Sequence, residues 1–151
     1  MRVSPRERAT ARRAALQAVY QWQVSGGDAG EVITEFRQEG RLKGADQAYF
    51  VRLVRGVVGD APSLDAALGK LLTDREVEEV DQVARALLRV GAYELRDCPE
   101  TPWRVVINEA VRLAHEFGSE ASHRYVNAVL DRLAQTWRGT EIAADPKRSR
   151  D

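Results

Sequence analysis

The residues best able to do chemistry in this chain of 151 residues are arginines near its N-terminus. Residues 1–24 hold five arginines, at positions 2, 6, 8, 12 and 13, against one acidic residue, Glu7. This segment therefore carries 5 − 1 = 4 positive charges, although the whole chain balances 23 basic against 23 acidic residues. Arg8 and Arg12, four residues apart, would share one helix face and repel each other. The pattern fits either a solvated helical turn or a surface that binds a polyanion.

Two tyrosines could join these arginines in binding nucleic acid. In the recognition of single-stranded RNA, basic side chains neutralise phosphates and aromatic rings stack on unpaired bases. Tyr20 follows the N-terminal arginines, and Arg124 and Tyr125 form a second basic–aromatic pair near the C-terminus. Each tyrosine could equally be a half-buried core residue, so the residues alone leave both interpretations open.

The sequence carries no recognisable catalytic or metal-binding motif. Neither G-x-G-x-x-G nor G-x-x-x-x-G-K-[ST] occurs, which argues against a dinucleotide site and a P-loop. The single cysteine, Cys98, excludes an internal disulfide and a cysteine cluster for zinc. The two histidines, His115 and His123, have no nucleophilic partner at a recognisable spacing. We therefore expect no cofactor, no metal and no enzymatic activity.

Composition favours a soluble globular protein of the cytoplasm. Hydrophobic residues make up 44% and charged residues 30% of the chain, which is typical of such proteins. No run of about 18 apolar residues occurs, so no membrane contact is expected, and the N-terminus lacks the apolar region of a signal peptide. The length suits a single core. We expect one all-helical domain over residues 1–138 and a disordered polar tail over residues 139–151.

Helical periodicity accounts for nearly all of the predicted domain. Apolar residues recur at intervals of three and four, and no segment alternates as a strand would. Seven helical patterns are predicted, joined by short breaks: residues 4–24, 31–38, 46–58, 63–72, 77–98, 101–117 and 119–137. The fifth pattern is apolar on more than one face and should be central. Gly91 within it predicts a close helix crossing.

The last two patterns form the most strongly marked stretch, which predicts a helical hairpin over residues 101–133. Thr101 is a good N-cap for the first helix, and Gly118 is predicted to end that helix in the left-handed conformation. Asn108 and Asn127 lie among apolar neighbours in the two helices. We expect both amides to be buried and paired.

Three segments resemble the NusB family of bacterial transcription antitermination factors. They are RRAALQAVYQWQ (residues 12–23), LRVGAYEL (residues 88–95) and VINEAVRLAHEFGSEASHRYVNAVLDRL (residues 106–133). The resemblance runs in the same order over nearly the whole chain, from about residue 8 to residue 133. It implies an all-α, NusB-like fold with about seven helices in two packed helical subdomains.

The resemblance also implies a function in RNA binding with a protein partner. Members of the family bind boxA, a uridine-containing element of ribosomal RNA leaders, together with the small-subunit ribosomal protein NusE, and join an RNA polymerase antitermination complex. The residues expected to bind RNA are Arg6, Arg8, Arg12, Tyr20, Ala121, Arg124 and Tyr125. The residues expected to contact NusE are two carboxylates at the beginning of the central helix, Glu78 and Glu79.

Two departures and two alternatives accompany this expectation. Glu7 interrupts the arginine run, and Ala121 stands where many members of the family have an acidic residue. The missing carboxylate should favour RNA binding, because it reduces repulsion of the phosphates.

One alternative function is that of an RNA-binding accessory domain related to the N-terminal domain of RNA cytosine-5 methyltransferases. The other is a homodimer that masks its RNA face until NusE binds.

Overall fold

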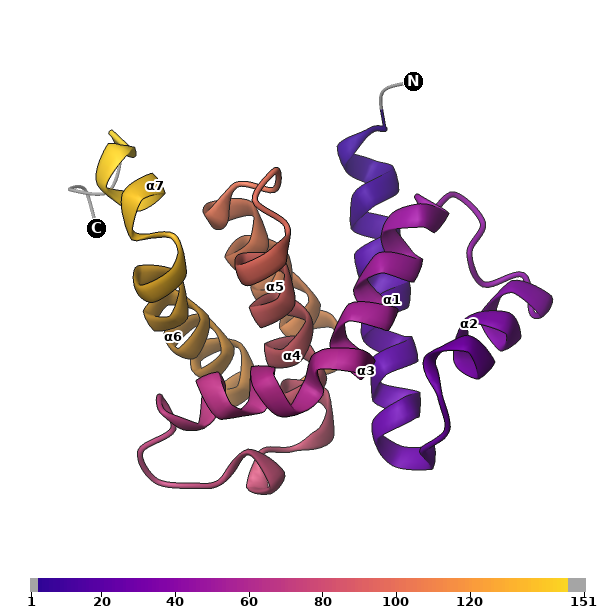
Figure 1. The fold of residues 1–151 in the computed structure, drawn as a ribbon, viewed down its shortest axis with the longest axis horizontal. Helices are drawn as coiled ribbons and strands as arrows, with labels where there is room; N and C mark the ends of the chain where they lie inside the picture. Colours follow the sequence, from indigo (N-terminus) through magenta and orange to yellow (C-terminus); the bar gives the residue numbers. More distant parts are fainter. Residues whose placement is uncertain (1–2, 147–151) are drawn as a thin grey trace.

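The computed structural model describes residues 3–146, which form seven α-helices and one short 3-10 helix without any strand (Figure 1). The helices are α1 (Pro5–Ser25), α2 (Ala29–Gln38), α3 (Gln47–Gly69), η1 (Val77–Glu79), α4 (Gln82–Asp97), α5 (Trp103–Phe117), α6 (Glu120–Trp137) and α7 (Gly139–Ala144). The predicted all-α class is confirmed. The helix count also agrees, but two predicted helices are joined in α3 and α7 is an addition.

The central position predicted for the fifth pattern is confirmed by α4, which contacts α1, α3, α5 and α6. Helices α1 and α2 lie on one side of the molecule with the first part of α3, and α5, α6 and α7 lie on the other (Figure 1). Buried apolar side chains from all seven α-helices and η1 form one contiguous cluster. The two groups of helices therefore share one core.

Helix α3 replaces the two separate helices that the sequence predicts over residues 46–58 and 63–72. Its backbone leaves helical geometry at Asp60, where φ is −108° and ψ is 15°, and Pro62 lies two residues further on. Proline removes a helix hydrogen bond and its ring clashes with the preceding turn, which kinks a helix without always ending it. The second part of α3 then crosses to the side of α6 (Figure 1).

Two glycines permit close packing around α6. A Cβ on Gly91 would lie 2.7 Å from Leu130 Cδ1, so α4 and α6 cross closely there, as predicted. Gly118 ends α5, but with an extended φ of −107° rather than the predicted left-handed conformation. A Cβ on Gly118 would lie 2.9 Å from the Ala114 carbonyl oxygen and 3.1 Å from Ser122 Cβ. Glycine is thus needed at position 118 because a larger side chain would clash with its neighbours, and not because the backbone has a positive φ.

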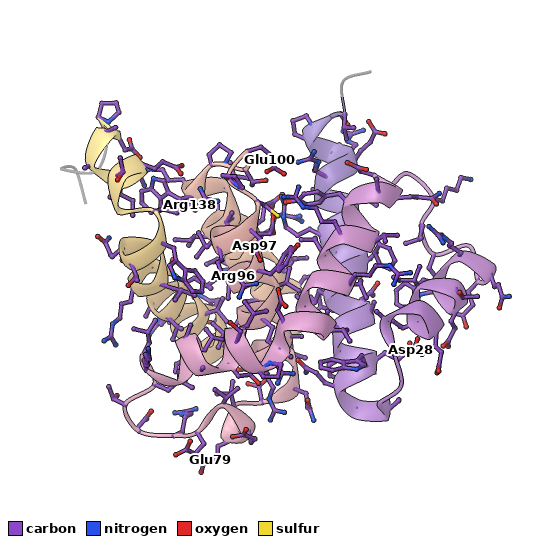
Figure 2. The ribbon with its side chains drawn as sticks, viewed as in Figure 1. Asp28, Glu79, Arg96, Asp97, Glu100 and Arg138 are labelled. Atoms are coloured by element: carbon purple, nitrogen blue, oxygen red, sulfur yellow. The ribbon has the colours of Figure 1, made fainter. Side chains whose placement is uncertain are left out.

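The start of α5 and the end of the chain differ from the prediction. The Thr101 side chain does not cap α5; its Oγ1 lies 3.1 Å from the buried Tyr49 hydroxyl. The predicted disordered tail instead forms α7 from residue 139, and Ile142 is buried. Arg138, at the junction of α6 and α7 in Figure 2, donates hydrogen bonds to the carbonyl groups of residues 94, 95 and 98 at the end of α4. Residues 147–151 of the predicted tail lie outside the described residues.

No helix among residues 3–146 combines the length and the apolar character needed to span a bilayer.

Candidate nucleic-acid interface

Arg12, one of the predicted RNA contacts, is a core residue. Its side chain is 4% exposed, and Nε and Nη2 donate hydrogen bonds of 2.7 and 2.9 Å to the two carboxylate oxygens of Glu94 on α4. The Tyr49 hydroxyl donates to the same carboxylate at 2.5 Å. Burial by itself would lower the pKa of Arg12, but the hydrogen bond and charge of Glu94 raise it above its ordinary value. In this position Arg12 is not accessible to a phosphate, so its burial argues against the predicted RNA contact, which stays untested.

Arg8 lies at the edge of the same network and is half-buried. Its Nε is 3.0 Å from Asp46 Oδ2, and its Nη1 is 3.9 Å from Glu100 Oε2. Its guanidinium also lies 4.1 Å from the centre of the Tyr49 ring. Figure 2 shows Glu100 on the turn between α4 and α5, close to the N-terminal half of α1. RNA would have to compete with two carboxylates for Arg8, which makes it a weaker candidate than an exposed arginine.

The exposed arginines of α1 instead face α5. Arg6 and Arg13 from α1 and Arg112 from α5 border a shallow depression of about 370 Å³. Arg13 Nη2 lies 2.6 Å from Glu116 Oε1, and Arg112 Nε lies 2.7 Å from Glu109 Oε2. Pairs of this kind at a surface contribute little stability, so their arginines are available to an anionic ligand at small cost. Arg6 was predicted as a site residue, whereas Arg13 and Arg112 were missed.

A second depression, of about 380 Å³, lies between α5 and α6. It is lined by two asparagines, one arginine, one histidine and one valine: Asn108, Asn127, Arg124, His123 and Val111. Both asparagines are exposed, so the prediction that their amides are buried and paired is wrong. The rings of His115 and His123 stack beside this depression, with centroids 4.0 Å apart and planes inclined by 24°. No sequence pattern indicated this contact, because the two histidines come from different helices.

The predicted aromatic residues lie in other places. Tyr20 is 41% exposed and borders an apolar groove of about 440 Å³ together with Val24, Val83 and Phe117. Tyr125 is half-buried, and the Arg75 guanidinium lies 4.9 Å from its ring centre. Burial raises the pKa of Tyr125, and the charge of Arg75 opposes this effect.

Arg124 and Tyr125 therefore point to different sides of α6, one toward α5 and the other toward the loop that precedes α4. The predicted basic–aromatic pair does not form one site. Ala121 is exposed in the first turn of α6, on the same helix end as Arg124.

The predicted partner residues Glu78 and Glu79 lie in η1, before α4 rather than within it. Both are exposed, and the Glu79 carboxylate accepts a 2.7 Å hydrogen bond from the Glu76 backbone N–H. Figure 2 shows Glu79 at the outer edge of this loop, pointing away from the helices. The contact with NusE stays a prediction.

Three helices together present one polar surface, which we call the α1–α5–α6 face. Its basic residues and histidines are Arg6, Arg13, Arg112, His115, His123 and Arg124. Its acidic residues are Glu109, Glu116 and Glu120. Four arginines against three glutamates leave a small positive balance on this face. Within residues 3–146, no cluster of three or more histidine, cysteine or acidic side chains is arranged to hold a metal ion.

Residues 9–135 of the chain match the model of the NusB family. The chain belongs to the NusB family. A protein of Xanthomonas axonopodis pv. citri (strain 306), named transcription antitermination protein NusB, is 54% identical over 142 residues, which are 94% of this chain and 89% of that relative. The resemblance inferred from the three sequence segments is thus confirmed.

Solved structures of NusB proteins share the fold. A structure of T. maritima NusB superposes with a TM-score of 0.78 at 27% identity, over 89% of this chain and 93% of that one. NusB in a crystal structure of the antitermination factors NusB and NusE in complex with dsRNA gives a TM-score of 0.80 at 28% identity, over 89% of this chain and 100% of that one.

Proposed function

We propose that this protein is a transcription antitermination factor that binds boxA-type RNA of ribosomal RNA leaders together with NusE and joins the RNA polymerase antitermination complex. The observation that carries the proposal is the match to the NusB family over residues 9–135, with relatives named as transcription antitermination proteins. The similarity to NusB in a complex with NusE and dsRNA supports both partners. We propose no catalytic role.

The α1–α5–α6 face is the surface that we assign to RNA. Exposed arginines neutralise backbone phosphates and release counterions, which contributes affinity without base specificity. Arg6, Arg13 and Arg112 surround one depression, and Arg124 lies at the next one across α5. A strand that runs over α5 would therefore meet cations along its path. Arg8 contributes only where RNA displaces Asp46 or Glu100.

The partner surface is proposed separately from the RNA surface. Glu78 and Glu79 are exposed carboxylates in η1, on the loop before α4, and Figure 2 shows Glu79 at the opposite end of the molecule from the start of α1. We assign them to NusE because a negative loop would complement a basic partner, and repulsion would keep RNA away from it. Glu78→Lys together with Glu79→Lys should weaken NusE binding without weakening the binding of RNA alone.

The test is a titration of boxA RNA with and without NusE at two salt concentrations. Fluorescence anisotropy of labelled RNA should report binding by the protein, tighter binding when NusE is present, and a steep loss of affinity with salt. An RNA of the same length with a scrambled boxA sequence is the control for specificity. The proposal fails if the labelled boxA RNA binds neither the protein nor its mixture with NusE.

A further inference from the structure

The depression between α5 and α6 places two exposed amides opposite each other. Asn108 on α5 and Asn127 on α6 both line it, and its volume of about 380 Å³ falls within the range of small-molecule sites, about 300–1,000 Å³. Within the described part of the chain, neither amide side chain is hydrogen-bonded to another residue. Asparagine is among the poorer helix formers. Two asparagines in mid-helix therefore lower helix stability, and no hydrogen bond within the protein offsets this loss. Their presence points to a ligand.

The His123 ring borders the same depression and is held in place by a second histidine ring that lies outside the lining. His123 belongs to the lining, whereas His115 does not, and the two rings stack at 4.0 Å. His123 Nε2 also lies 3.3 Å from Glu120 Oε2 on its own helix. The His123 ring is thus fixed from two directions, and a fixed ring is a better stacking surface than a mobile one because less entropy is lost on binding.

One cation completes the site. Arg124 is exposed, and the lining contains no carboxylate. Unlike Arg13 and Arg112, Arg124 has no ion-pair partner among residues 3–146. A phosphate at Arg124 would therefore displace no existing salt bridge, and a single negative charge matches what the depression offers.

We propose that this depression binds one unpaired nucleotide of RNA. The two amides contact the base edge, the His123 ring contacts the base or its ribose, and Arg124 contacts the phosphate. An amide side chain offers two donors and one acceptor oxygen, the groups needed to read the edge of a splayed base. An acidic peptide would call for several cations, and the lining offers a single arginine, Arg124. The inference rests on the proposed RNA-binding function and adds a specific subsite to it.

The experiment combines protein variants with RNA in which single bases are removed. Wild type, Asn108→Ala and Asn127→Ala are titrated with boxA RNA and with a set of RNAs that each carry one abasic nucleotide, in the presence of NusE and at fixed salt. Each asparagine variant should bind the intact RNA about 5- to 10-fold more weakly, the loss expected from one or two hydrogen bonds. At one nucleotide position, removal of the base should weaken binding by the wild type more than binding by either variant, because each variant has already lost one of the contacts to that base.

Gln135→Ala is the matched control, because Gln135 is an exposed amide later on α6 and outside the depression. It should bind every RNA as the wild type does. His123→Phe should retain most of the affinity that His123→Ala loses if the ring acts by stacking. Circular dichroism should show equal helix content in all variants, since none of the substituted residues is a core residue.

The proposal is overturned if both asparagine variants bind all RNAs like the wild type, or if they lose the same factor for every abasic position. Either result leaves the proposed function standing, because the intact RNA still binds. Tight binding of an acidic peptide with no effect of base removal on RNA binding would also overturn it. If no RNA binds even with NusE, the proposed function fails, which is a different outcome.

Discussion

Replacement of Arg12 should destabilise the protein rather than remove an RNA contact. Arg12→Met keeps most of the side-chain volume but leaves the Glu94 carboxylate, which is 1% exposed, without its cation. Removing one partner of a buried ion pair costs about 3–5 kcal/mol. Since the free energy of unfolding of a domain is about 5–15 kcal/mol, this loss is a large part of the total. For a protein of this size it corresponds to a decrease in Tm of about 6–20 °C.

Urea denaturation followed by circular dichroism measures this loss directly. Arg13→Met is the matched control, because Arg13 is the next residue along α1 and its pair with Glu116 is exposed; it should cost less than about 1 kcal/mol. The double variant Arg12→Met, Glu94→Gln should recover a large part of the lost stability. The neutral amide can still accept the hydrogen bond from Tyr49, and no buried charge remains unpaired.

Two results would refute this reasoning. One is a free energy of unfolding of Arg12→Met within about 1 kcal/mol of that of the wild type, since breaking a buried ion pair costs more than this. The other is a variant that stays folded yet binds boxA RNA more weakly, with a salt dependence reduced by about one phosphate contact. That pattern would mean that Arg12 leaves the core to bind RNA.

Four further outcomes are expected. Arg124→Ala should weaken RNA binding and reduce the slope of log affinity against log salt by about one. Ala121→Asp should also weaken it, because a carboxylate then stands at the exposed first turn of α6, and high salt should reduce the difference. Burial raises the pKa of the Cys98 thiol to about 11 from an ordinary value of 9.0. Iodoacetamide should therefore label Cys98 slowly in the native protein and rapidly in urea. The contribution of the neutral thiol to the free energy of unfolding should be complete below pH 9.0 and should be lost as the pH rises through 11. Arg138→Met should cost about 2–4 kcal/mol in urea denaturation, because three carbonyl groups near the end of α4 lose their donor.

Each of these expectations has a contrary result. An unchanged salt slope for Arg124→Ala would remove it from the phosphate path, and unchanged affinity of Ala121→Asp at low salt would place RNA away from the start of α6. Labelling of native Cys98 at the rate seen in urea would show that its region opens readily. A urea midpoint of Arg138→Met equal to that of the wild type would show that the Arg138 side chain does not stabilise the end of α4.

Local patterns in the sequence determined the elements of this protein. Helical periodicity depends only on which side chains recur every three or four residues, so it located most of the helices and predicted the absence of strands. Gly91 indicated a helix crossing because a missing side chain inside an apolar helix has few other uses. The segment 106–133 identified the family. The kink at Asp60 was not predicted, because Pro62 is compatible with either a helix break or a bend.

Only the tertiary structure decided what each polar residue does. Arg6, Arg8, Arg12 and Arg13 have the same charge and nearly the same place in the chain, yet Arg12 is buried because the packing of α1 on α4 brings Glu94, 82 residues away, to its side chain. The asparagines and stacked histidines of α5 and α6 likewise meet across two helices, and their partners are set by how those helices pack. Periodicity records which residues share a face, but not what that face will touch. For this reason the sequence indicated an RNA-binding protein and its helices, whereas the α1–α5–α6 face became visible only in the folded chain.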